Sequence, residues 1–181
     1  MKKLSLLVAV AFVGLLPAAK YEVDASHSSV GFEVKHMMVS KVKGDFKKLS
    51  GSIDFDGKNV KGLSGEVNIA DINTNNNSRD DHLKAKDFFD AKGFPKATLK
   101  MTKFEKGKLY ADVKIRDVTK NIAFKAEVSG PIKHPRNGKN VISLSLSGEL
   151  NRKDFKVGSD TPDNQVSDIV GLSIELEAVE K

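Results

Sequence analysis

The chain has 181 residues, with 30 lysines and arginines against 24 aspartates and glutamates, and it contains neither cysteine nor tryptophan. This length favours one domain, and no linker, low-complexity tract or repeat divides the sequence. The excess positive charge is spread along the chain, and lysines such as Lys96 and Lys100 alternate with apolar residues, as on a solvated strand face. This distribution argues against nucleic acid as a partner.

The first residues are typical of a secretory signal peptide. Two lysines precede an almost wholly apolar run over residues 4–16, and a Pro-Ala-Ala sequence ends at Ala19. The apolar run is shorter than the about 20 residues that a membrane-spanning helix needs. We therefore expect residues 1–19 to be removed and residues 20–181 to form one exported, periplasmic domain. Because cysteine is absent, we expect neither a lipoprotein anchor nor disulfide bonds.

From Tyr21 onward, apolar residues recur at every second position, which is the pattern of half-buried antiparallel strands. Glycine, proline and polar segments between the alternating runs supply turns. The runs cover residues 29–35, 53–55, 63–69, 97–101, 109–115, 122–128, 142–150 and 172–178.

One helix is predicted, over about residues 78–90. Ser78 is the expected N-cap, acidic residues follow it in the first turn, and Gly93 and Pro95 end the segment. The helix would carry an apolar face that ends in the pair Phe88 and Phe89. In a chain made otherwise of strands, such a face is expected to cover an open end of the β-structure.

About eight strands with one dry face must hide that face from water, so the pattern predicts an all-β fold, either a two-sheet sandwich or a closed antiparallel barrel. We favour the barrel, with the helix packed at one end. The interior of such a barrel is either filled by side chains or holds one slender ligand. Several inward positions are alanine or glycine, which permits a cavity, but dense packing against the phenylalanines is an equal alternative.

Several motifs, in the same order along the chain, resemble those of the YceI-like family, and the resemblance covers nearly the whole chain after the signal. Two departures occur at turns, Asp117 and Lys156, where the family commonly has glycine. The matching motifs are VDASHSSVGFEVKH at residues 23–36, VKGDF at 42–46, TNNNSRDDHL at 74–83, DFFD at 87–90 with Phe94-Pro95, RDVTK at 116–120 and NRKDF at 151–155.

This resemblance implies a lipocalin-like, elongated barrel that holds a polyisoprenoid or another long-chain amphiphile, such as a fatty acid or fatty amide, in an apolar tunnel. It also implies frequent homodimers, and we expect peripheral contact with a membrane and no cofactor. The tunnel wall is expected to consist of Phe32, Val34, Val67, Phe88, Phe89, Phe94, Leu99, Val113, Phe124, Ala126, Leu144, Leu146 and Ile174. The residues expected at the head group or rim are His36, Arg79, Asp80, His82, Arg152 and Asp154.

The charged residues have two interpretations. Arg79 and Asp80 either form a structural ion pair or cap that fixes the helix on the barrel, or they contact the ligand. The structural interpretation is favoured because buried charges are usually paired. In the other, Arg79 and the helix N-terminus hold a phosphate or carboxylate with the help of His82. Arg152 and Asp154 have the same two interpretations, and the structural one is again favoured.

No metal site is predicted. His27, His36 and His82 could converge with Asp80 on one ion, but their spacing matches no short zinc motif. His36 precedes two methionines and is interpreted as a residue of the barrel rim.

An enzyme is not expected. The chain lacks the Gly-x-Ser-x-Gly motif of a serine hydrolase and any cofactor fingerprint. The adjacent carboxylates Asp80 and Asp81 would diverge on a helix, so they do not make a facing acid and base. We therefore expect an exported binding or carrier protein. The alternative is a non-catalytic structural, interaction or stress-related barrel with no bound lipid.

Overall fold

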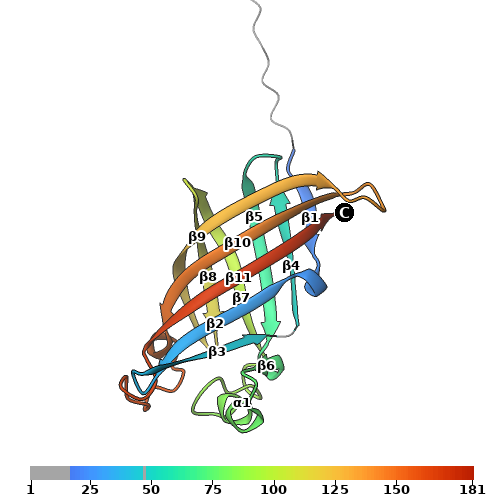
Figure 1. Cartoon of the computed structure of the whole chain (residues 1–181). Coiled ribbons are helices and arrows are strands. Elements are labelled where there is room, and N and C mark those ends of the chain that lie inside the picture. Colours follow the sequence, from blue (N-terminus) through green and yellow to red (C-terminus); the bar gives the residue numbers. More distant parts are fainter. Residues whose placement is uncertain (1–16, 47) are drawn as a thin grey trace, which may run out of the picture.

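The computed structural model describes residues 17–46 and 48–181, so most of the expected signal peptide lies outside the described residues. The fold consists almost entirely of antiparallel strands (Figure 1). The strands are β1 (Ala19–Val23), β2 (Ser29–His36), β3 (Ser40–Phe46), β4 (Leu49–Phe55), β5 (Val60–Asn68), β6 (Ile72–Asn73), β7 (Lys96–Glu105), β8 (Lys108–Ile115), β9 (Val118–Lys133), β10 (Asn140–Asn151) and β11 (Ile169–Glu180). The helices are α1 (Asn77–Leu83) and the short 3₁₀ turns η1 (Ala25–His27), η2 (Ile69–Asp71) and η3 (Arg152–Phe155).

Eight strands form a closed ring, in the order β1, β4, β5, β7, β8, β9, β10, β11, and β1 closes the ring by pairing with both β4 and β11. The edge of β11 is shared. Its last residues pair with β1, whereas Gly171–Glu175 pair with β2. From there β2, β3 and β6 extend the wall toward α1. The predicted all-β antiparallel barrel with a short helix is confirmed.

The predicted helix was too long. The N-cap is Asn76, whose side chain accepts a hydrogen bond from the Arg79 N–H, and α1 ends at Leu83. Beyond it the chain makes a series of turns, and Asp90 adopts a left-handed backbone conformation with φ of 50°. These turns bring Phe88 into the barrel end, where it is 8% exposed. The sequence pattern marked the apolar residues correctly, but the backbone that carries them is not helical.

The barrel is filled at the end away from α1. Ile53, Leu109, Ile142 and Leu144 are at most 1% exposed, and Ala111 is fully buried. The ring of Tyr21 meets that of Phe55 edge-on at 6.2 Å. Close packing of this kind leaves no room for a ligand there, so any site in the interior lies toward α1.

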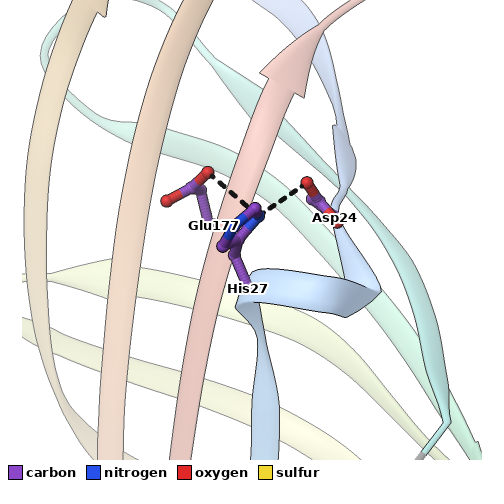
Figure 2. Close-up of side chains that lie close together, drawn as sticks. All are labelled: Asp24, His27 and Glu177. Atoms are coloured by element: carbon purple, nitrogen blue, oxygen red, sulfur yellow. Dashed lines mark hydrogen bonds and ion pairs between the residues drawn. The ribbon is translucent and has the colours of Figure 1, made fainter.

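The turn η1 packs on the outside of the barrel, beside β11 (Figure 2). His27 Nδ1 lies 2.9 Å from Asp24 Oδ2 and 3.7 Å from Glu177 Oε1. The hydrogen bond to Asp24 raises the pKa of His27. The pKa of Asp24 is lowered to about 2, first by the Ser26 hydroxyl and then by His27. The cluster thus ties the beginning of the domain to its last strand.

We expect the stabilising effect of His27 to depend on pH. A raised pKa in the folded state means that the contribution is fully present below the unfolded pKa of about 6.5 and is lost as the pH rises through the folded pKa. The urea midpoint of the wild type should therefore exceed that of His27→Gln at pH 5.5, and the difference should shrink by pH 8. In an Asp24→Asn background the difference should become smaller, because only the more distant Glu177 remains as an acidic partner of His27. A difference that does not vary with pH would show that the pair does not form in solution.

No helix within the described residues is long and apolar enough to cross a membrane.

Candidate functional site

A cavity of about 480 Å³ occupies the half of the barrel that faces α1. Its walls come from strands on all sides of the ring and from β2 and β3, and the segment that follows α1 contributes Phe88 and Phe89. The lining is mostly aliphatic and aromatic. It includes these residues of the predicted tunnel wall: Phe32, Val34, Val67, Phe88, Phe89, Leu99, Val113, Phe124, Leu146 and Ile174.

Three predicted wall residues lie elsewhere. Ala126 and Leu144 are buried, but they belong to the filled part of the barrel, where Ala126 donates its N–H to Gly107 O in the turn between β7 and β8. The ring of Phe94 lies outside the cavity, 5.7 Å from the guanidinium of Arg116. Alternation along a strand marks inward residues but does not tell which half of a barrel is hollow, and this explains the three differences.

The sequence prediction also missed part of the wall. The undetected residues include Phe46 of β3, Leu83 of α1, and Phe155 and Val157 at the end of η3. Phe155 could have been found, because it belongs to the NRKDF motif. From that motif only the charged residues Arg152 and Asp154 were predicted as site residues. Phe46 and Leu83 likewise end the motifs VKGDF and TNNNSRDDHL, whereas Val157 follows η3 and lies in no strand whose alternation could mark it.

The mouth of the cavity holds the guanidinium of Arg79. Its Nε and Nη2 donate to the hydroxyl and the carbonyl oxygen of Thr74, each at 2.8 Å. Asp80 is 6% exposed and accepts from the N–H and the hydroxyl of the same Thr74. The ion-pair form of the structural interpretation is therefore wrong, because Thr74 lies between the two charges. Both side chains instead bind Thr74 and so fix the start of α1 to the segment before it. No described carboxylate forms an ion pair with Arg79.

Two histidines also line the cavity, His82 from α1 and His36 from the end of β2. His82 Nε2 lies 3.0 Å from Asp87 Oδ2, and its ring meets Phe88 edge-on at 4.8 Å. His36 ends β2 and forms a backbone bridge with Val166. The mouth therefore combines one cation with two imidazoles above an apolar interior.

Arg152 is a structural residue. It is 4% exposed, and it also borders the cavity. Its acidic partner is Asp168 at 2.8 Å, whereas Asp154 is exposed and lies outside the cavity lining. The guanidinium also donates to the carbonyl oxygens of Val157, Gly158, Thr161, Val166 and Ser167. Arg152 therefore holds the segment between η3 and β11 against the barrel, and its hydrogen-bonding capacity is used within the protein.

The histidines do not converge on one metal site. Among the residues that the structure describes, one group of histidine and carboxylate side chains has its ligand atoms within 4.8 Å of one another, namely Asp24, His27 and Glu177. This group lies on the outer wall of the barrel (Figure 2) and does not line the cavity. The hydrogen bond between His27 and Asp24 explains why these side chains lie close together.

The barrel and its cavity have known counterparts. Residues 21–178 match the family model described as a YceI-like domain. The chain is 32% identical over 157 residues to a UPF0312 protein of Staphylococcus aureus, which covers 86% of this chain and 92% of that protein. It is similar to the crystal structure of a Campylobacter jejuni YCEI protein, with a TM-score of 0.75, 38% identity and coverage of 100% of this chain and 99% of that chain.

A more distant solved structure shares the fold. It is a polyisoprenoid-binding domain from Saccharophagus degradans, with a TM-score of 0.70 and 16% identity, and the match covers 89% of this chain and 98% of that chain. The match of the family model over nearly all described residues and the similarity to the relatives agree with the motifs in the sequence. The chain therefore belongs to the YceI-like family.

Proposed function

We propose that this protein is a binding or carrier protein that holds one long-chain amphiphile, with the tail in the cavity and the polar head at the mouth. The observation that carries the proposal is the apolar cavity of about 480 Å³ at the α1 end. Protein interiors seldom leave spaces larger than a water molecule, and cavities of about 300–1,000 Å³ are the usual size of small-molecule sites. No chemical step is required of the walls, so the role is binding and not catalysis.

The walls favour a hydrocarbon tail. Each methylene group removed from water contributes about 0.8 kcal/mol, so a long polyprenyl or acyl chain is stabilised by apolar contact alone. Phe32, Phe124 and Ile174 offer such contact from different strands. The name of the Saccharophagus degradans domain supports the lipid class, because that domain shares the fold.

The head group is proposed to be a phosphate or a carboxylate. Arg79 borders the cavity and directs Nε and Nη2 to Thr74, and within the part of the chain that the structure describes no hydrogen bond engages its Nη1. A guanidinium binds such anions through charge-assisted hydrogen bonds. His36 and His82 stand at the same mouth and supply further polar contacts.

Arg79→Gln should weaken the binding of a fatty acid by roughly 10- to 100-fold, because a hydrogen bond to a charged group contributes about 1.5–3 kcal/mol. Binding of the fatty alcohol of the same chain length should change little. Competition titrations against one fluorescent fatty acid measure both. Lys86→Gln is the matched control, since Lys86 is an exposed cation near α1 that does not line the cavity. Equal weakening of acid and alcohol would contradict a contact between Arg79 and the head group.

Organic extraction of the purified protein, followed by mass spectrometry, tests the proposed function. A single class of prenyl or acyl lipid in stoichiometric amount, and reloading of the delipidated protein, would support it. A protein that yields no lipid and takes up none would instead be the non-catalytic structural or stress-related barrel.

We further propose that the protein acts in the periplasm after export through residues 1–19, which the apolar run over residues 4–16 supports. N-terminal sequencing of the protein from a periplasmic fraction should begin near Lys20.

A homodimer is also proposed, from the family resemblance. Sedimentation equilibrium measures the mass of the assembly and so tests this proposal.

A further inference from the structure

Three consecutive apolar residues are exposed to solvent at the turn between β2 and β3. Met37, Met38 and Val39 are 54%, 52% and 88% exposed, and we call them the hairpin tip. Ile169, at the start of β11, is a further exposed apolar residue and lies on the same side of the barrel end, two residues before the Gly171–Glu33 pair. Contiguous exposed apolar residues usually mark a contact surface.

The hairpin tip is held in place. The N–H of Met37 donates to Gln165 O at 2.8 Å, and the N–H of Val39 donates to His36 O at 3.2 Å. Met37 and Met38 have φ of 52° and 58°. The Val39–His36 hydrogen bond closes a β-turn in which they hold the two central positions, and Asn-Gly adopts that conformation more easily than methionine. The conformation of the turn therefore does not explain the two methionines. Hydrogen bonds hold the backbone of the hairpin tip, so the side chains are exposed at a fixed position.

The hairpin tip adjoins the cavity mouth. Met37 and His36 both line the cavity, as do Arg79 of α1 and Gln165, which binds the hairpin. Figure 1 shows the β2–β3 connection at the same end of the barrel as α1. A surface that contacts the hairpin tip would therefore lie next to the opening of the cavity.

The strands that carry the hairpin tip are basic. Lys35 and Lys41 face each other directly behind it, and Lys43 follows on β3. The two strands also carry two acids farther from the hairpin tip, Asp45 and Glu33, and Glu33 is paired with Lys41 at 2.6 Å and Lys43 at 3.6 Å. The neighbouring segment before β11 carries acids such as Asp163, so the whole barrel end is not uniformly basic. The charged side chains on β2 and β3 nearest the hairpin tip are thus the lysine pair Lys35 and Lys41, an arrangement that fits a surface with an apolar interior and anionic head groups.

We propose that the hairpin tip inserts among the head groups of an anionic phospholipid bilayer and so holds the cavity mouth at the membrane from which the cargo is taken. The inference rests on the proposed function, because a lipid cargo resides in a bilayer. A protein partner fits less well. A stable interface takes about 800 Å² and about 20–30 residues from each partner, and the hairpin tip has only three residues.

The absence of tryptophan allows a direct test. Val39→Trp places a single fluorophore at the hairpin tip. Its emission should shift to the blue with vesicles of phosphatidylcholine and phosphatidylglycerol, less so with phosphatidylcholine alone, and lipids brominated on their acyl chains should quench it. Asn137→Trp is the matched control, since Asn137 is exposed in the turn between β9 and β10 at the other end of the barrel. It should show neither effect.

A second variant tests the consequence. Met38→Asp with Val39→Asp should reduce co-sedimentation with the anionic vesicles at least about tenfold, because a charged side chain inserts poorly into lipid. The urea midpoint should stay near that of the wild type, since both side chains are exposed. Uptake of fatty acid from vesicles should slow, while the affinity for fatty acid in solution should be unchanged.

The failures of the two proposals are distinguishable. If Val39→Trp responds to neither kind of vesicle while lipid is recovered from the purified protein, the membrane role of the hairpin tip is overturned and the proposed function stands. If the aspartate variant changes the oligomeric state and leaves vesicle binding intact, the hairpin tip is a contact between copies and the proposal is again wrong. A third outcome is possible. If the aspartate variant no longer binds vesicles, and no lipid is recovered from the wild type, the membrane role of the hairpin tip is supported and the proposed function is overturned.

Discussion

Val113→Trp is expected to abolish lipid binding while the barrel remains folded. Val113 is 7% exposed and lines the cavity from the last part of β8. An indole ring there would occupy space needed by the tail, so the lipid recovered per chain should fall at least about tenfold. Overpacking of a filled core costs roughly 1–3 kcal/mol, and the cost here should lie at the low end because the ring enters an existing cavity. Mass spectrometry of the extract and a urea titration measure the two quantities.

The matched control is Lys114→Trp. Lys114 is the next residue on β8, is exposed, and points to the opposite face of the wall. This variant should carry lipid like the wild type. If Val113→Trp also binds lipid normally, the tail does not pass β8, and the ligand must occupy another part of the molecule.

Arg152→Met is expected to lower the free energy of unfolding by roughly 3–5 kcal/mol, as when one partner of a buried ion pair is removed. The substitution removes the donor from five carbonyl oxygens and leaves Asp168 with Lys153, at 3.1 Å, as its remaining cationic partner. A domain has only about 5–15 kcal/mol of stability in total, so the variant should lie near the limit of folding. Urea denaturation followed by circular dichroism gives the loss directly.

Two variants separate the causes of this loss. Arg152→Lys should remain strongly destabilised, because one ammonium group cannot donate to all these carbonyls. Asp168→Asn should lose less, since Arg152 keeps its carbonyl acceptors. An Arg152→Met protein as stable as the wild type, but with altered lipid preference, would identify Arg152 as a ligand-binding residue and contradict the structural role assigned to it.

The alternating pattern predicted the long strands because a half-buried strand must place apolar residues on one face. The run through Leu109 and Ile115 became β8, and the run through Ile142 and Leu150 became β10. The short strands β1, β3 and β6 were not predicted individually. Their apolar positions are too few to establish a period, and their place in the sheet depends on partners that are distant in sequence, such as Glu180 for Tyr21.

The polar contacts of the site were less predictable. Thr74 separates Arg79 from Asp80, and Asp168 replaces Asp154 as the partner of Arg152. Both arrangements depend on how turns bring residues together, and periodicity carries no information about that. Composition could not decide between a filled and a hollow barrel either. The same kinds of apolar residue pack densely at one end and line the cavity at the other.

The ring is closed by the two ends of the domain. Tyr21 and Val23 of β1 pair with Glu180 and Ala178 of β11, so the seam joins residues separated by almost the whole chain. The barrel therefore cannot close on the ribosome before its last residues are synthesised. Contacts between such distant residues also form slowly, because the entropy of closing a long loop opposes them. A nascent chain of this design keeps the β1 edge of its barrel unpaired with β11 until the last strand has been made.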